Sequence, residues 1–279
     1  ALFDSVRKAA PKQFINVGVA EQGLIGLSAG LARSGFLPIA YGLSAFLPIR
    51  VLEQIKLDLC ISKLPVLLLG DGAGLVYSTL GSSHQCGEDI AALRPMQGIR
   101  IYSPADGFEL EACFRRAMSD REGPTYLRMG KSDRKAVQTK IPETVEFTYP
   151  RKKGSTKVLL VGTGSMSSAA VELAEKFDAD AMSVIRIKPF PESLVPELTK
   201  YEKVFVLEEH SRFGGLFSAI AEEIGLSGPR NPPQLYSISL KDQFARRCGS
   251  HEYALSEHEL TTAQIEKFVE NQLRVPGVG

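Results

Sequence analysis

The sequence has few cysteines, no long apolar run and almost no net charge, and each of these absences excludes a class of protein. Its four cysteines are scattered and form no C-x-x-C pair, so we expect neither a disulfide framework nor a structural zinc site, and a reducing cytoplasm fits. No run approaches the roughly 18 apolar residues of a membrane-spanning helix. The net charge of +1 favours neither nucleic acid nor an anionic membrane as a partner.

The length and composition of the sequence are those of a globular protein with two domains. It has 279 residues, of which 44% are hydrophobic and 23% are charged. Strand-like and helical stretches alternate in the first half, lapse where prolines, a glycine and a basic cluster predict a linker, and then resume. Such alternation predicts parallel sheets flanked by helices. We therefore expect an α/β fold of two domains, 1–137 and 157–279, joined by a linker at 138–156.

Several elements of this pattern carry signals of their own. Phe14 to Val17 is a short apolar run of strand type. Val66 to Gly70 is continuously apolar, as a buried parallel strand should be. Asp106 lies where it can cap a helix, and Thr261 with Gln264 three residues later predicts a capping box at the start of the last helix.

Three residues are candidates for chemistry, and each has two interpretations. Glu21 lies near the start of a long helix rich in Ala, Leu and Gly. There it either complements the helix dipole or forms a buried carboxylate that shares a proton with a ligand. Phe46 follows a predicted strand and is either a core aromatic or a stacking surface. His84, in a polar loop that contains glycine, is either solvated or a proton shuttle.

The segments around these residues resemble those of the transketolase and deoxyxylulose-phosphate synthase family. Asn16-Val-Gly-Val-Ala-Glu-Gln22 resembles its pyrimidine-binding segment, and Ser44-Ala-Phe-Leu47 resembles its Ser/Thr-x-Phe-Leu stretch. Gly81-Ser-Ser-His-Gln85 resembles its Gly-Pro-Thr-His-Gln motif. The resemblance runs from about Phe14 to Leu273, with the motifs in the order of the family.

The resemblance implies a role for each candidate. Glu21 is expected to hydrogen-bond N1′ of the aminopyrimidine of thiamine diphosphate. Phe46 is expected to stack on that ring. His84 is expected to face the cofactor and the substrate oxygen, where it binds substrate and donates or shuttles a proton. Glu21 and His84 are thus the expected catalytic residues.

Other positions depart from the pattern of the family, mostly at the sugar end of the site. Where some relatives carry a second aromatic three residues after Phe46, this chain has Ile49, which can give the cofactor only an aliphatic contact. Leu80 replaces an aspartate that recognises the hydroxyl next to the ketose carbonyl, and Gly72 lies where transketolases proper carry a His-Asp pair. Lys131 replaces a phosphate-binding arginine and offers the substrate a point charge rather than a fork. The resemblance therefore implies a retained cofactor end and an altered sugar end.

Three further motifs are interpreted as incidental. Gly70-Asp-Gly72 resembles the start of a magnesium motif, but the required Asn roughly 25 to 30 residues later is missing, so no metal ligand is predicted. Gly162-Thr-Gly-Ser-Met-Ser167 lacks the third glycine of a dinucleotide loop. The acidic and histidine neighbours at 208–210 and 256–259 lack the spacing of metal ligands, so we expect them to be solvated.

The resemblance implies the C-terminal half of a split transketolase: a pyrimidine-binding domain followed by the C-terminal domain of the family. We expect the diphosphate- and Mg²⁺-binding domain on an N-terminal partner subunit, in an α2β2 heterotetramer, and we expect a further strand and helix of the family before Ala1. The implied reaction moves a two-carbon ketol unit to an aldehyde from a ketose that we expect to be modified. Two alternatives stay open: the beta subunit of a 2-oxoacid dehydrogenase, and a non-catalytic partner subunit.

Overall fold

The computed structural model describes residues 3–130 and 134–274. Its helices are α1 (Asp4–Ala9), α2 (Glu21–Arg33), α3 (Leu47–Arg50), α4 (Leu52–Gln54), α5 (Asp89–Leu93), α6 (Gly107–Ser119), α7 (Met166–Lys176), α8 (Leu194–Leu198), α9 (Leu216–Ser227), α10 (His251–Glu257) and α11 (Thr262–Arg274). Short 3-10 turns lie at η1 (Pro11–Gln13), η3 (Ser78–Leu80) and η4 (Ser82–His84), and a π-helical turn, η2, spans Ile55–Cys60.

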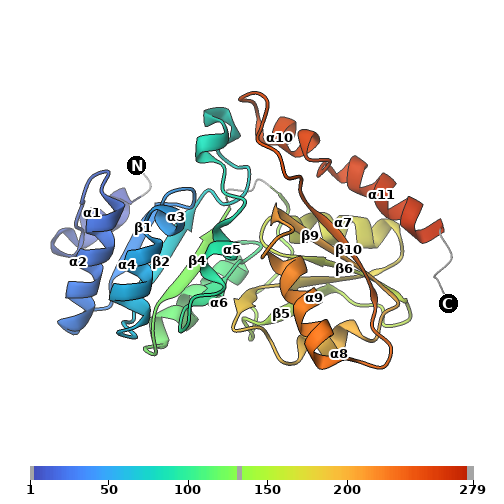
Figure 1. Cartoon of the computed structure of the whole chain (residues 1–279), viewed down its shortest axis with the longest axis horizontal. Helices are drawn as coiled ribbons and strands as arrows, with labels where there is room; N and C mark the ends of the chain where they lie inside the picture. Colours follow the sequence, from blue (N-terminus) through green and yellow to red (C-terminus); the bar gives the residue numbers. More distant parts are fainter. Residues whose placement is uncertain (1–2, 131–133, 275–279) are drawn as a thin grey trace.

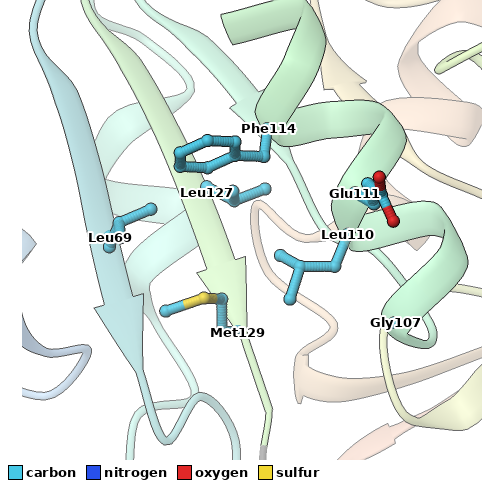
Figure 2. Close-up of a pocket in the computed structure, with 7 residues that line it drawn as sticks. All are labelled: Leu69, Gly107, Leu110, Glu111, Phe114, Leu127 and Met129. Atoms are coloured by element: carbon cyan, nitrogen blue, oxygen red, sulfur yellow. The ribbon is translucent and has the colours of Figure 1, made fainter. Parts of the chain in front are cut away.

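The first half of the chain builds one mostly parallel sheet, which occupies the blue-to-green side of Figure 1. Its strand order is β1 (Ile39–Leu43), β2 (Leu67–Asp71), β4 (Thr125–Met129), β3 (Arg100–Tyr102) and β8 (Arg186–Lys188). The first four strands pair in parallel, and β8 pairs antiparallel with β3. On one face, an apolar hollow lies between α6 and strands β2 and β4 (Figure 2).

The second half builds the other sheet, in the order β10 (Gln234–Leu240), β9 (Lys203–Ser211), β6 (Val158–Gly162), β7 (Asp180–Val184) and β5 (Phe147–Arg151). All of its pairs are parallel except the one between β5 and β7. Helices α7 and α11 pack their apolar side chains against one face, where Leu173, Ile265 and Val269 meet Phe205 and Leu207 of β9. In Figure 1, α8 and α9 lie away from α7 and α11.

The α/β fold class with two mostly parallel sheets is confirmed by this topology. Two local predictions are also confirmed. The carboxylate of Asp106 accepts hydrogen bonds from the amides of Phe108 and Glu109, both at 3.0 Å, at the start of α6. The amide of Thr261 donates to Gln264 Oε1 at 3.3 Å, and the amide of Gln264 donates back to Thr261 Oγ1 at 3.4 Å. These reciprocal bonds satisfy amides that the first helical turn leaves unpaired.

The strand expected at Phe14 to Val17 is wrong. Residues 14–18, all of them in the described part of the chain, form no strand, and the Ile15 side chain is half exposed. A hydrogen bond of 2.8 Å from the Gly18 amide to Asn16 Oδ1 bends the segment, and Gly18 takes a positive φ of 71°. A turn at this point delivers the chain to α2, which begins three residues later.

The two halves are interleaved in sequence and packed together. The range expected to be a linker, 138–156, contains β5, which belongs to the second sheet, while β8 from the second half closes the first sheet. One cluster of buried apolar side chains extends from Ile25 of α2 through Ile101 of β3 to Val206 of β9. Among the described residues, no helix is long and apolar enough to cross a membrane.

Candidate functional site

The candidate site is built on loops that follow the carboxyl ends of β1 and β2. These strands are parallel neighbours, with Leu43 opposite Asp71 in the register, so the loops that leave them emerge side by side. The amide of Ser44 donates to the Asp71 carbonyl at 2.7 Å and ties the two exits together. The first loop leads to Phe46 and the second to His84. In open parallel sheets this edge is where ligands bind.

Glu21 is the first residue of α2, and no side chain caps that helix. Its carboxylate accepts a hydrogen bond from Nη1 of Arg50 at 2.7 Å. The Glu21 side chain is only 14% exposed, whereas that of Arg50 is 45% exposed. Burial raises the pKa of Glu21, but the hydrogen bond and the charge of Arg50, with the help of the backbone, outweigh burial and hold this pKa below its ordinary value. Glu21 is thus a mostly buried, ionised carboxylate at a helix N-terminus.

Arg50 links Glu21 to Phe46, and Phe46 in turn contacts His84. The guanidinium carbon of Arg50 lies 4.5 Å from the centroid of the Phe46 ring, which is within the range of a cation–π contact. The Phe46 ring in turn lies 5.2 Å from the His84 ring, edge to face at 73°. Nδ1 of His84 lies 3.0 Å from Ser83 Oγ. The structure thus brings Glu21, Phe46 and His84 into one cluster, although the first and the last are far apart in the sequence.

Of the two other expected site residues, only Ile49 lies in the described part of the chain. Ile49 is half buried in α3, between the buried Pro48 and the exposed Arg50. Lys131 lies outside the described residues.

At the sugar end of the site, the structure shows why position 72 is a glycine. Gly72 has a positive φ of 74°, and a Cβ built on it would lie 1.9 Å from Cε2 of Tyr77. The Tyr77 ring therefore fills the space that a side chain at position 72 would need. Its hydroxyl donates to Asp71 Oδ2 at 3.0 Å, and that of Tyr41 donates to the same oxygen at 2.6 Å. Leu80 lies further along this loop with 54% of its surface exposed.

A buried ion pair joins the start of α5 to β4. The Nε of Arg128 donates to Asp89 at 2.8 Å, with side chains only 4% and 0% exposed. The hydroxyl of Tyr126 donates to the same carboxylate at 2.8 Å. Nη2 of Arg128 donates to the carbonyl of Glu209 at 2.9 Å, which joins the two halves of the chain. Each buried charge thus has hydrogen-bonded partners in place of water.

Glu209 forms a second buried junction, between the His84 loop and the second half. Its carboxylate accepts hydrogen bonds from the amide of Leu75 at 3.1 Å and from Ser165 Oγ at 2.6 Å, and it lies 2.9 Å from Nε2 of His251. Burial raises the pKa of Glu209, but these partners outweigh burial and lower it to about 2. Burial lowers the pKa of His251, but the carboxylate raises it above its ordinary value. Both shifts favour the ionised form of the pair.

The expectation that the acidic and histidine neighbours at 208–210 and 256–259 are solvated is wrong for most of them. Glu208, Glu209, His210 and His258 are all buried. The carboxylate of Glu208 accepts hydrogen bonds from the amides of Leu216 and Phe217 at 2.7 and 3.0 Å, at the start of α9. Free amides at a helix N-terminus can replace water around a carboxylate, which is why such a residue can be buried. Burial nevertheless raises the pKa of Glu208 to about 7.

The described residues fit an aminopyrimidine but offer no metal shell. A mostly buried carboxylate and an aromatic face stand close together, as recognition of a flat heterocycle with a protonatable nitrogen requires. No group of three or more His, Cys, Asp or Glu within 3–130 and 134–274 could hold a metal ion. The apolar hollow of Figure 2, lined by Leu110, Phe114 and Met129 among others, contains none of the expected site residues.

Arg50 is the residue of the cluster that the sequence did not single out. It follows Phe46 by four positions, at the end of α3, and α-helical spacing places it over the ring of Phe46. An exposed arginine near a helix end is also a common surface feature, so sequence reasoning had no ground to prefer a site there. The ion pairs formed by Asp89 and Glu209 have no local sequence signal either, because their burial depends on contacts between distant segments.

Comparison with known proteins agrees with this arrangement. Residues 1–135 match the family described as "Transketolase, pyrimidine binding domain", and residues 148–242 match "Transketolase, C-terminal domain". The chain is 32% identical over 276 residues to one subunit of the apulose-4-phosphate transketolase of Phocaeicola vulgatus, across 93% of this chain and 85% of that protein. It is 31% identical over 264 residues to "6-deoxy-6-sulfo-D-fructose transketolase subunit SqwH" of Clostridium sp., across 91% of this chain and 80% of that protein.

A solved structure described as "Split gene transketolase, inactive beta4 tetramer" superposes with a TM-score of 0.84 at 29% identity, covering 97% of this chain and 89% of that one. Sequence and structure therefore agree over both halves. The chain belongs to the transketolase family and carries its pyrimidine-binding and C-terminal domains.

Proposed function

We propose that the chain is the C-terminal subunit of a split, thiamine-diphosphate-dependent transketolase that transfers a two-carbon ketol unit from a modified ketose to an aldehyde. The observation that carries this proposal is the cluster of Glu21, Phe46 and His84 at the carboxyl edge of the first sheet. Relatives named as transketolase subunits, similar over both halves of the chain, support it.

In this proposal each residue of the cluster has one task. Glu21 accepts a hydrogen bond from N1′ of the aminopyrimidine and stabilises its protonated form. Phe46 and Ile49 hold the ring by stacking and aliphatic contact, and His84 holds or moves a proton at the substrate oxygen. Thiamine diphosphate, when bound, supplies the chemistry that breaks and forms carbon–carbon bonds.

The diphosphate and its Mg²⁺ are assigned to the N-terminal subunit of an α2β2 assembly. The described residues of this chain include no metal-binding group, and relatives of similar extent are named as subunits. A β4 tetramer of a similar chain is described as inactive, which favours a requirement for that partner. We also propose that the division into 1–137, 138–156 and 157–279 marks the two functional domains, with β5 as the part of the connecting segment that joins the second sheet.

The altered sugar end favours a modified substrate. A sugar hydroxyl placed against Leu80 would lose its water partner and gain none, which costs roughly 1 to 3 kcal/mol. Tyr77 fills the space beside Gly72, so no charged side chain can extend from that position. We propose that Lys131 contributes a positive charge for a phosphate or another acidic group of the sugar. The sugars in the names of the two relatives, apulose 4-phosphate and 6-deoxy-6-sulfofructose, are both modified and acidic.

The test is a kinetic comparison with the chain reconstituted with its N-terminal partner subunit. We expect kcat/KM for a deoxy or otherwise modified acidic ketose to exceed that for xylulose 5-phosphate by about ten- to a hundredfold, which is the cost of one unpaired hydroxyl. Preferred turnover of xylulose 5-phosphate would contradict the substrate proposal. Lipoamide-dependent oxidation of a 2-oxoacid by the same pair would contradict the transketolase proposal and favour a dehydrogenase.

A further inference from the structure

Arg50 makes two contacts that define the geometry of the candidate site. Its Nη1 donates to Glu21 Oε2 at 2.7 Å, and its guanidinium carbon lies 4.5 Å from the centroid of the Phe46 ring. One flat cationic group thus joins the carboxylate and the aromatic face. The backbone of Arg50 is fixed at the end of α3, where its amide donates to the Phe46 carbonyl at 3.1 Å.

These two contacts are those that an aminopyrimidine would need from the same residues. Its protonated ring nitrogen would donate to the Glu21 carboxylate, and its flat ring would lie on Phe46. A guanidinium is also flat, also donates N–H groups in its plane, and also stacks on aromatic faces. The arginine therefore occupies the Glu21 carboxylate and the Phe46 ring in the same way as the aminopyrimidine of the proposed function would.

The ion pair and the proposed chemistry compete for one carboxylate. Sharing a proton with a ring nitrogen requires that Glu21 can be protonated, whereas Arg50 holds its pKa below the ordinary value against the opposing effect of burial. Arg50 has room to leave, because 45% of its side chain is exposed, against 14% for Glu21. A rotation of the arginine side chain into water would uncover Glu21 and Phe46 without moving α2 or α3.

We propose that Arg50 is a placeholder for the aminopyrimidine: it binds Glu21 and Phe46 until the cofactor arrives and is displaced by it. This inference rests on the proposed function and adds to it a competition that lowers cofactor affinity. It also gives Arg50 a use in the uncombined subunit, where it neutralises a mostly buried carboxylate.

The probe is the isolated pyrimidine fragment, 4-amino-5-hydroxymethyl-2-methylpyrimidine, titrated into the chain by calorimetry. We expect Arg50→Met to bind it roughly tenfold more tightly than the natural chain, because one partly exposed ion pair and one cation–π contact no longer compete. Arg33→Met is the matched control: Arg33 ends the same helix that Glu21 begins, is exposed, and contacts Ser62. It removes the same charge and should leave the affinity unchanged.

When thiamine diphosphate is titrated into the reconstituted pair, we again expect Arg50→Met to bind more tightly than the natural chain and Arg33→Met to bind equally well. Weaker or unchanged binding by Arg50→Met in both titrations would overturn the proposal, since Arg50 would then be a positioning residue or a bystander. The double variant Glu21→Gln/Arg50→Met, compared with Arg50→Met, separates this failure from failure of the proposed function, because the competing arginine is absent from both. If the two bind the fragment equally well, Glu21 does not recognise a pyrimidine and the site assignment itself is wrong.

Discussion

The buried carboxylate of Glu209 should control how firmly the His84 loop is held to the second half of the chain. Glu209 is 2% exposed, and its partners come from three segments: the amide of Leu75 in that loop, Ser165 before α7, and His251 at the start of α10. The substitution Glu209→Gln keeps the size of the side chain and removes its charge. The His251 imidazole then has no anion beside it. In addition, the amide nitrogen of the glutamine donates hydrogen bonds, whereas both carboxylate oxygens only accept them.

The expected magnitude follows from the pKa of the carboxyl. A pKa that falls from 4.5 in the unfolded chain to about 2 in the folded one corresponds to a contribution of about 3 kcal/mol at neutral pH. Since this pKa is lowered on folding, the contribution is present above pH 4.5 and is lost as the pH falls toward 2. The pKa of His251 is raised, so its contribution is complete below pH 6.5 and is lost at higher pH. The pair should stabilise most between about pH 4.5 and about 6.5.

Urea unfolding monitored by circular dichroism measures this effect across the pH range. We expect Glu209→Gln to lower the free energy of unfolding by about 3 kcal/mol near pH 6, with the deficit shrinking toward acid. The matched control is Glu175→Gln, which removes the same charge from an exposed position on α7 and should cost less than about 0.5 kcal/mol. A deficit that is independent of pH, or no larger than that of the control, would refute the account of an ionised pair.

Two further perturbations test the candidate site and the buried ion pair of Asp89 and Arg128. We expect His84→Asn to lower kcat of the reconstituted pair by roughly a hundredfold while calorimetry finds the same affinity for thiamine diphosphate; an unchanged kcat would remove His84 from the reaction. We expect Asp89→Asn to lower the free energy of unfolding by about 3 to 5 kcal/mol, because Arg128 would keep a buried charge without its anion. Urea unfolding measures this as well, and a loss below about 1 kcal/mol would show that the Arg128 charge has other compensation.

Much of the fold followed from local patterns in the sequence. The continuous apolar run at 66–70 predicted the buried strand β2, and Asp106 and Thr261 marked the starts of α6 and α11. These signals are local, because they depend on residues within one turn or one strand. The run Phe14 to Val17 has the same apolar character but pairs with no strand, and Gly18 turns it toward α2 instead. Strand pairing depends on a neighbour that a single segment cannot reveal.

The sequence singled out three residues of the candidate cluster, but neither Arg50 nor the contacts that join them. Glu21, Phe46 and His84 carried the family resemblance, and the structure places them in contact through Arg50 and through the ring pair. Arg50 could not be found, since a surface arginine at a helix end has the same sequence signal. The burial of Glu209 likewise could not be foreseen, because its partners lie 134 and 42 positions away.

The central claim is that Glu21 activates the aminopyrimidine of thiamine diphosphate for ketol transfer. Its most direct test is the turnover of the reconstituted pair with Glu21→Gln in place of the natural subunit, on the preferred ketose and at saturating cofactor. We predict a loss of at least about two orders of magnitude, together with loss of the circular-dichroism signal of the imino form of the cofactor. Near-normal turnover with that signal intact would contradict the claim.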